Sequence, residues 1–278
     1  MVEWSRNTPW RQGHVLPEEA AVALNLKKLQ AAEPTAVVVI SHDCDLAAAP
    51  GSEPHVEVIC GCLIDSPDGN FTYAKAPRTL HVPFVDGDRE QWVELVATEK
   101  VLISKTDLAE FSPRTDFHLE SSGHATLQRW LAARYRRAAF PDVFDKRLED
   151  SGLRDKLTRI LRPTGEHIAA IFFDIDDGKE ETRIDPSDTY TLDIFLVYTT
   201  ALDPEKAQAA AEEACRRIEV AFQKKLLAPT GKWTFIELRD CSVISDEALS
   251  YKQSTLFKQW RLEQLSLRKD PHEPMLED

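Results

Sequence analysis

Long apolar runs are missing from this chain of 278 residues. No stretch approaches the ~18–20 consecutive apolar residues that a membrane-spanning helix requires. The opening, MVEWSRNTPWRQG, also lacks the apolar core of a secretory signal. We therefore expect a cytoplasmic protein without a membrane span.

Cysteine and positive charge are scarce as well. The five cysteines are an odd number and lie scattered along the chain, which does not suggest a disulfide framework and favours a reducing compartment. The net charge of −13 argues against a general nucleic-acid coat protein, which would be basic.

The charge that is present is unevenly distributed. Ten Lys/Arg and five Asp/Glu lie between Arg129 and Arg162, so this segment carries +5 and the rest of the chain −18. Either the segment binds an anionic partner or it docks on the acidic part of its own chain. For a partner, the candidate residues are Arg134, Arg136 and Arg137.

The pattern of apolar residues divides the chain into three parts and predicts an α+β fold. Residues 1–112 show a helix at 17–33 and then short strands at regular spacing, typical of a small β-barrel. Residues 113–162 predict a basic helical segment, interrupted at Pro141. Residues 163–278 predict a helix-covered sheet in the order β-β-α-β-α, with the last helix over 246–268.

One helix of the third part is signalled with particular clarity. Asp203 suits its N-cap and Pro204 its first position. Its apolar face should contain Ala207, Ala211, Ala214, Ile218, Ala221 and Phe222.

The densest group of reactive side chains is SHDCD, which follows the apolar run TAVVVI. If the strand continues through it, Ser41, Asp43 and Asp45 share one face, and His42 and Cys44 share the other. A simple hairpin centred near Pro50 would pair Ser41 with Cys60. The candidate catalytic residues are Ser41, Asp43, Cys44 and Asp45.

Two metals suit parts of this segment, although we expect no cofactor. His42 and Cys44, with Cys60 and Cys62 on the next strand, have the ligand types of a tetrahedral Zn²⁺ site. Asp43 and Asp45 have the oxygen ligands that Mg²⁺ prefers. A cysteine nucleophile is disfavoured because the flanking carboxylates raise a thiol pKa.

A structural role for Asp45 is the preferred alternative. Arg134 falls within the apolar stripe of its predicted helix, and a core-facing Arg needs an acidic partner or a path to solvent. We therefore expect a buried, bidentate salt bridge between Asp45 and Arg134.

Two further segments predict ordinary structure. DIDDG, at Asp174 to Gly178, lacks the alternating acids and terminal Glu of a calcium loop and predicts a hairpin turn. GHAT, which contains His124, predicts the start of a helix.

The segments RQGHVL, EPTAVVVIS, VEVICGCLI and VELVATEKVLISKTDL follow one another as in the MazF/PemK toxin family. The chain resembles this family over about 100 residues, mainly as apolar pattern, which implies an SH3/PemK-like barrel. Members are endoribonucleases that use an Arg before the Pro of the central strand. Here Glu33 precedes Pro34, and His14 stands where the family has Asp, so the resemblance implies the fold rather than the cleavage.

The chain is also similar to a group of bacterial proteins that have Ser-x-x-Cys-Asp after an apolar strand. Ser41, Cys44 and Asp45, then RYRRAAFPD, then the pair Leu265 and Ser266 carry this resemblance. It implies a bacterial, intracellular origin but no established activity.

Two functions remain open. The first is a toxin, immunity or phage-defence protein that binds an anionic partner, which could be nucleic acid, a nucleotide or an acidic protein. The alternative is a metal-assisted nuclease or other hydrolase with its site at SHDCD. The first is preferred because no complete catalytic constellation is present in the sequence.

Overall fold

The computed structural model describes residues 4–26, 35–133, 140–179, 183, 185, 187–201, 203–250 and 257–261. Within these residues the chain forms two compact units. The first unit contains 4–67 and 76–133, and the second contains 68–75 and 140–261. Helices and strands occur in both, so the predicted α+β class is confirmed.

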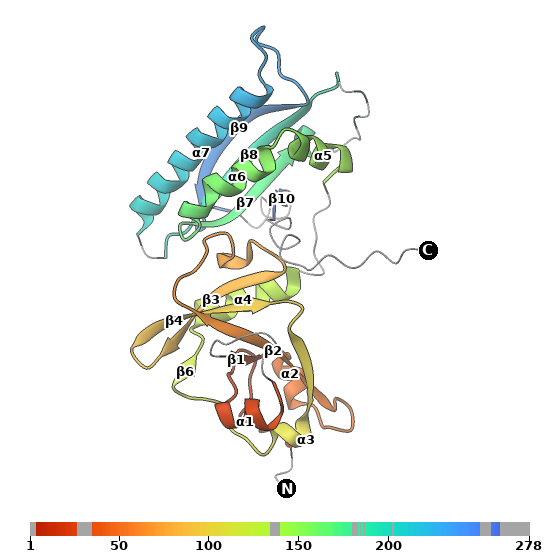
Figure 1. Cartoon of the computed structure of the whole chain (residues 1–278), viewed down its shortest axis with the longest axis vertical. Coiled ribbons are helices and arrows are strands. Elements are labelled where there is room, and N and C mark those ends of the chain that lie inside the picture. The colour runs from red at the N-terminus through yellow and green to blue at the C-terminus, as the bar shows by residue number, and fades with distance from the viewer. Residues whose placement is uncertain are drawn as a thin grey trace. The chain divides into compact units, whose positions relative to one another are not determined.

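The first unit is built on a curled, half-barrel sheet (Figure 1). Its strands are β1 (Thr35–Val39), β2 (His55–Ile64), β3 (Thr79–Asp86), β4 (Arg89–Val96), β5 (Lys100–Ser104) and β6 (Phe117–His118). The order is β1-β2-β4-β3-β6, β5 pairs with β2, and all pairings are antiparallel. The long strand β2 bends the sheet because its first half pairs with β5 and its last residues with β4.

Four helices belong to this unit: α1 (Glu18–Ala23), α2 (Asp43–Ala47), α3 (Lys105–Leu108) and α4 (Ser121–Ala133). Helix α4 packs against β3 and buries Leu127 and Trp130. The segment expected as a separate helical part at 113–162 is therefore divided, because α4 packs with the first unit and the helices after residue 140 pack with the second.

The SHDCD segment is not the end of a strand. Strand β1 stops at Val39, and residues 43–47 form α2. The imidazole Nδ1 of His42 accepts a hydrogen bond from the Cys44 N–H (3.2 Å) and so caps the helix. The register also differs by four residues from the expected one, because Val37 rather than Ser41 pairs with Cys60.

The other end of α2 is held by a buried lysine. Lys105 has no exposed side-chain surface, and its Nζ donates to the carbonyl oxygens of Asp45 and Ala48, the latter at 2.8 Å. Burial lowers the pKa of Lys105, and the neighbouring Glu53 and Asp45 oppose part of that change. The indole of Trp4 lies beneath the amine at 5.6 Å and donates to the Leu46 carbonyl (2.8 Å). These contacts fix the short helix against the core.

Replacing this lysine should destabilise the first unit. Lys105→Met leaves the Ala48 carbonyl without its donor, while the Asp45 carbonyl keeps the Ala48 N–H, and this should lower the free energy of unfolding by about 1–3 kcal/mol. Urea denaturation followed by tryptophan fluorescence measures the change. Lys100→Met is the matched control, because Lys100 makes only a partly exposed ion pair with Glu57 (3.4 Å) and should cost less than about 1 kcal/mol. Equal effects of both substitutions would contradict the capping role.

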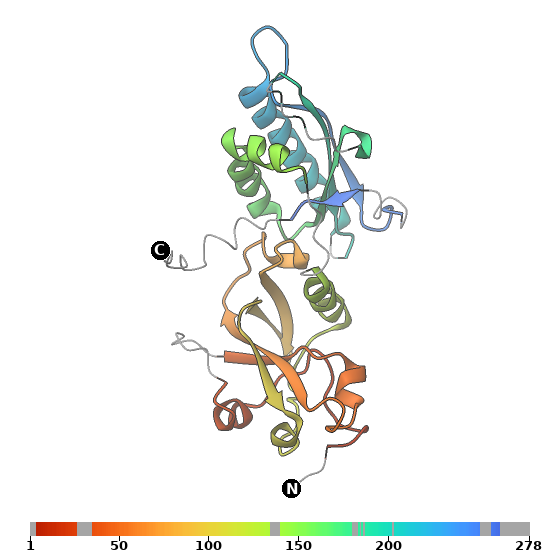
Figure 2. The same ribbon diagram turned by 90° about the vertical axis from the view of Figure 1, so that its right-hand side faces the viewer.

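The second unit has a four-stranded sheet. Its strands are β7 (Ile168–Ile175), β8 (Tyr190–Tyr198), β9 (Ile236–Ser245) and β10 (Lys258–Gln259), in the order β10-β7-β8-β9. Its α-helices are α5 (Asp142–Asp150), α6 (Leu153–Leu161) and α7 (Pro204–Leu226), and its 3₁₀ turns are η1 (Thr72–Ala74), η2 (Arg162–Thr164) and η3 (Asp176–Gly178). The parallel pair β8 and β9 is joined through α7, and Figure 2 shows the helices gathered on one side of the sheet.

The predictions for α7 are confirmed. The carboxylate of Asp203 accepts a hydrogen bond from the Lys206 N–H (3.0 Å), and Pro204 begins the helix. The whole expected apolar face is buried: Ala207, Ala211, Ala214, Ile218, Ala221 and Phe222.

The predicted last helix over 246–268 is wrong where the structure describes it. Residues 246–248 form a turn, and Lys258 and Gln259 form β10 against the edge of β7. Phe257 stacks on Phe195 (4.5 Å between centroids) and Trp260 on Phe173 (5.1 Å). Pairing with a free strand edge, together with aromatic packing on both sides, outweighs the helical spacing of this segment.

A buried arginine joins the loops at one end of this sheet. Arg147 of α5 lies with its guanidinium 5.1 Å from the centroid of the Tyr190 ring. It donates to four backbone carbonyls at 2.6–3.1 Å: Arg183, Asp185, Asp188 and Phe235.

The segment 68–75 enters the second unit by a close backbone approach. A Cβ on Gly165 would lie 2.1 Å from the carbonyl oxygen of Gly69, so only glycine fits there. The amine of Lys75 then donates to the carbonyls of Gly165 and Ile168 (2.8 Å for the latter). Burial lowers the pKa of Lys75 to about 7, and two acceptors satisfy both N–H groups of a neutral amine.

This lysine should make stability depend on pH. The folded-state pKa of about 7 lies below the ordinary 10.5, so the unfolded chain binds more protons between these values and stability rises with pH there. The difference in unfolding free energy between wild type and Lys75→Met should therefore grow in favour of wild type by roughly 1 kcal/mol per pH unit from pH 7 to 9. Urea denaturation at each pH measures it, and a difference that does not vary with pH would show that Lys75 stays charged.

Candidate functional site

The structure separates most of the SHDCD side chains. The Ser41 hydroxyl accepts from the Glu57 N–H (2.7 Å), and the Asp43 carboxylate accepts from the Gln12 N–H (2.8 Å). Cys44 and Asp45 are exposed on α2. Because residues 43–47 are helical, the side chains of SHDCD do not alternate between two faces as expected of a strand.

The salt bridge expected between Asp45 and Arg134 involves a residue outside the described part of the chain. Arg134, Arg136 and Arg137 lie outside the described residues, and the Asp45 side chain is exposed. The backbone carbonyl of Asp45, rather than its side chain, accepts a hydrogen bond from a cation, the Nζ of Lys105.

The proposed zinc ligands are not brought together either. Cys60 and Cys62 are buried on β2, where the Cys60 thiol contacts the Leu26 carbonyl (3.5 Å), whereas His42 and Cys44 are exposed. Among the described residues, the one group with three potential ligand atoms within 4.8 Å of one another is Asp174, Asp177 and Asp193. No residue of SHDCD belongs to it.

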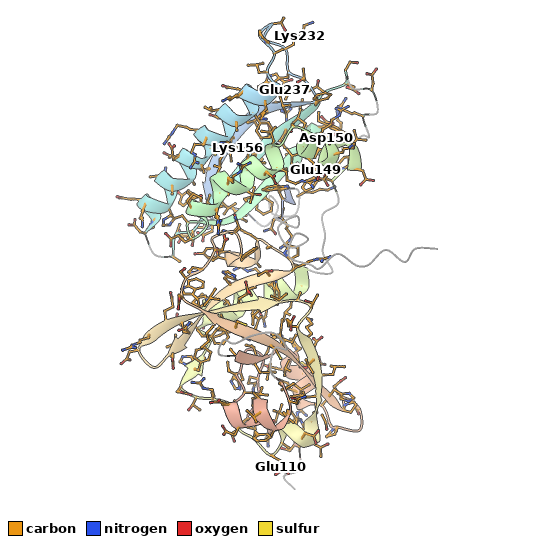
Figure 3. The ribbon with its side chains drawn as sticks, viewed as in Figure 1. Glu110, Glu149, Asp150, Lys156, Lys232 and Glu237 are labelled. Carbon is orange, nitrogen blue, oxygen red and sulfur yellow. The ribbon has the colours of Figure 1, made fainter. Side chains whose placement is uncertain are left out.

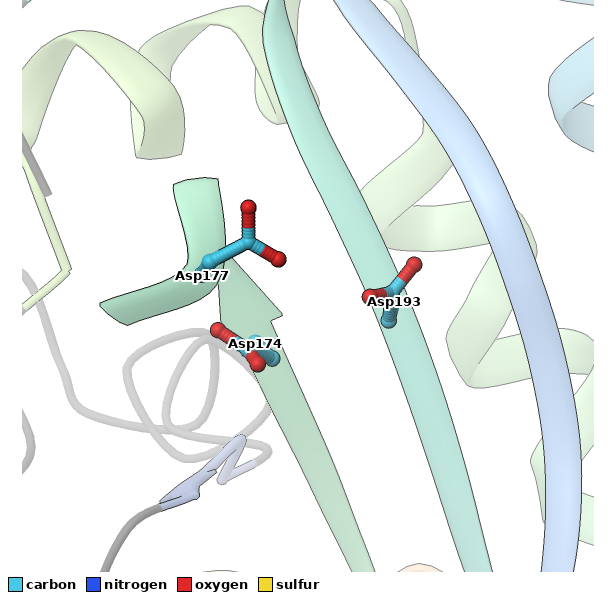
Figure 4. Close-up of side chains that lie close together, drawn as sticks. All are labelled: Asp174, Asp177 and Asp193. Atoms are coloured by element: carbon cyan, nitrogen blue, oxygen red, sulfur yellow. The ribbon is translucent and has the colours of Figure 1, made fainter. Parts of the chain in front are cut away.

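These three aspartates lie where β7 ends in η3 beside β8 (Figure 4). Arg239 of β9 donates to Asp177 (2.7 Å) and Asp193 (2.5 Å). Burial, Asp193 and Asp177 together raise the pKa of Asp174. The guanidinium of Arg239 neutralises much of the negative charge of these aspartates. The turn predicted at DIDDG is observed as η3, in which Asp176 and Asp177 have positive φ.

In the first unit, reactive side chains from three separate segments lie around the turn at residues 11–14. The Nδ1 of His14 accepts from the Arg11 N–H (3.1 Å), while Asp43 binds the N–H of Gln12. A Cβ on Gly13 would lie 3.2 Å from the His124 ring, so that imidazole packs on the same turn. His14, Asp43 and His124 thus surround four residues of backbone.

The pKa of His14 reflects these neighbours. Burial lowers the pKa of His14, Arg11 and His124 lower it further, and Asp43 acts in the opposite direction. Because Nδ1 accepts a hydrogen bond, the neutral His14 ring carries its proton on Nε2. Sequence reasoning treated RQGHVL, SHDCD and GHAT separately, and no pattern in the sequence indicates that they meet.

A basic groove lies between α6 and α7. It encloses about 440 Å³ and is lined by four cations, Lys156, Arg216, Arg217 and Lys224, with Glu213 and Val220 among the other residues. Figure 3 marks Lys156 on α6, beside α7. Lys156 is the only one of these that belongs to the predicted basic segment, and sequence reasoning missed the contribution of α7.

The charges in this basic groove are mostly available. Arg216 is paired with Glu213 (2.9 Å). Lys156, Arg217 and Lys224 are exposed and form no ion pair with any residue that the structure describes. Val220 is 62% exposed and provides an apolar patch between them.

Comparisons with protein-family models, with curated proteins and with solved structures found no match to this chain. Among the described helices, none is both long and apolar enough to cross a membrane.

Proposed function

We propose that the second unit binds a single-stranded nucleic acid in the basic groove between α6 and α7. The observation that carries the proposal is the concentration, in one 440 Å³ groove of a chain with net charge −13, of three cations that form no ion pair with a described residue. Solvated lysines scattered over a surface would not converge in this way. Phosphate groups bind such sites because each contact releases condensed counterions.

The dimensions of the groove favour a strand over a single small anion. Arg217 and Lys224 are seven residues apart on α7, which corresponds to about 10 Å along the helix. A single phosphate cannot contact cations at both ends of this length, whereas consecutive phosphates of one strand can. The exposed Val220 adds an apolar surface on which a base can lie.

The sequence resemblances agree with this proposal. The half-barrel of the first unit supports an SH3/PemK-like barrel, and the toxin, immunity or phage-defence role proposed for the chain involves an anionic partner. Both remain proposals that rest on the resemblance.

Charge reversal in the groove tests the proposal. Lys156→Glu, Arg217→Glu and Lys224→Glu together should weaken binding of a labelled RNA or DNA oligonucleotide by more than about tenfold at low salt, and should bring the slope of log K against log salt from about −2 towards zero. Fluorescence anisotropy measures both quantities.

The matched control keeps the same change in net charge outside the groove. Lys146, Lys179 and Lys232 are exposed in the same unit, and their joint reversal to Glu should leave most of the affinity in place. An equal loss in both triple variants would indicate a general charge effect, and an absence of binding by the wild type would end the proposal.

A second function is favoured by the meeting of His14, Asp43 and His124. Two imidazoles beside a carboxylate can act as general base and general acid, which is the chemistry of a nuclease or other hydrolase. Because the Arg11 N–H occupies Nδ1 of neutral His14, this ring acts as the donor through its Nε2–H, and His124 is the candidate base. Of the candidate catalytic residues in SHDCD, this hydrolase proposal retains Asp43, which positions the turn.

Substitution of each histidine tests this alternative. His14→Ala and His124→Ala should each reduce cleavage of a fluorogenic RNA oligonucleotide by about 100-fold or more, because each removes an acid–base group. His118→Ala, at an exposed histidine of the same unit, should retain full activity. Wild-type protein that leaves the substrate intact, or a fully active double variant, would rule out the hydrolase.

A further inference from the structure

Two cysteines that lie 26 positions apart in the sequence are in contact inside the second unit. Cys215 is on α7 and Cys241 on β9, with exposed fractions of 5% and 8%. Their sulfur atoms are 2.9 Å apart, and the thiol of Cys241 donates to the sulfur of Cys215. Both are free thiols in this structure.

The other three cysteines have different surroundings. Cys44 is exposed on α2, whereas Cys60 and Cys62 point to one face of β2 and are buried in the first unit. The Cys60 thiol contacts the Leu26 carbonyl (3.5 Å) rather than another sulfur. Contact between two thiols is therefore specific to Cys215 and Cys241 among the described residues.

We propose that Cys215 and Cys241 are a site of reversible oxidation that forms a disulfide between α7 and β9. The sulfur atoms need to approach by only about 0.9 Å to reach the bond length of a disulfide. Helix α7 already packs on β9, so no element has to be displaced. Disulfides that do form in reducing compartments are usually transient and are catalytic or redox-sensing.

The chemistry is complete with a peroxide as the oxidant. The sulfur of Cys215, which accepts the hydrogen bond from Cys241, attacks one peroxide oxygen and becomes a sulfenic acid while the second oxygen leaves as water. The Cys241 sulfur then attacks the sulfenic sulfur, the S–S bond forms, and a second water leaves. Two thiols and one hydrogen peroxide thus give one disulfide and two waters.

The environment makes this oxidation slow and dependent on pH. The hydrogen bond to Cys215 and burial both raise the pKa of Cys241, with Glu219 and Asp240 acting in the same direction. Because the thiolate is the reacting form, the rate of disulfide formation should increase with pH.

The disulfide would close a segment that contributes cations to the proposed nucleic-acid groove. The loop that it closes contains the second half of α7, with Arg217 and Lys224 of the basic groove, and the connection to β9. A disulfide would hold this half of α7 on the sheet. The oxidation itself does not depend on nucleic-acid binding, so the two proposals can fail separately.

Thiol counting on the full chain tests the inference. The reduced protein is treated with hydrogen peroxide, denatured in excess N-ethylmaleimide and weighed by mass spectrometry. The reduced chain should take up five maleimides, one for each cysteine, and the oxidised chain two fewer. Tryptic digestion should then show the peptide with Cys215 linked to the peptide with Cys241, and dithiothreitol should separate them.

Variants and thermal unfolding make the test specific. Oxidation should raise the Tm of the wild type by roughly 5–10 °C, because the closed loop restricts the unfolded chain. Cys241→Ser should abolish the shift, and Cys60→Ser, a buried cysteine of the first unit, should keep it. Uptake of five maleimides after peroxide treatment, sulfinic acid in place of the crosslink, or linkage through any other cysteine would refute the proposal.

Discussion

Buried basic side chains that donate to backbone carbonyls fix the positions of several segments of this protein. Lys105, Arg147 and Lys75 are each buried, and each directs its N–H groups to main-chain oxygens. Carbonyls at helix ends and in loops lack partners within their own elements, and leaving them unpaired inside a protein costs about 1–3 kcal/mol each. One long side chain therefore satisfies several of them at once and fixes the position of a whole segment.

One of these side chains, Lys105, is linked through α2 to the histidine cluster of the first unit. Lys105 holds the last carbonyls of α2, and α2 begins with Asp43, which binds the N–H of Gln12. The turn that follows presents His14 beside His124. The same turn also pairs directly with β1, where the Val39 N–H donates to the His14 carbonyl (2.8 Å). Lys105 and β1 together therefore place the His14 imidazole. In the second unit, Arg147 has the same role for the loops beside Tyr190.

Local signals predicted the regular elements well. The capping residues and apolar face of α7 are observed as expected, because a cap and a 3.6-residue period act within a few turns of the chain. The β-branched run at 35–39 is a strand, because such residues favour an extended backbone within a few positions of the chain. Where a segment's structure depends on a distant partner, the predictions were wrong. SHDCD became a helix capped by His42 and Lys105, and residues 258–259 joined the edge of β7.

Composition and short-range periodicity are enough to predict the α+β class, most helices and strands, and the acidic balance of the chain. The packing of the folded chain sets which reactive groups meet: His14 with Asp43 and His124, Lys156 with the cations of α7, and Cys215 with Cys241. Each of these groups unites residues from separate elements. Their distances depend on how sheets curl and helices pack, and no local pattern of residues encodes that geometry.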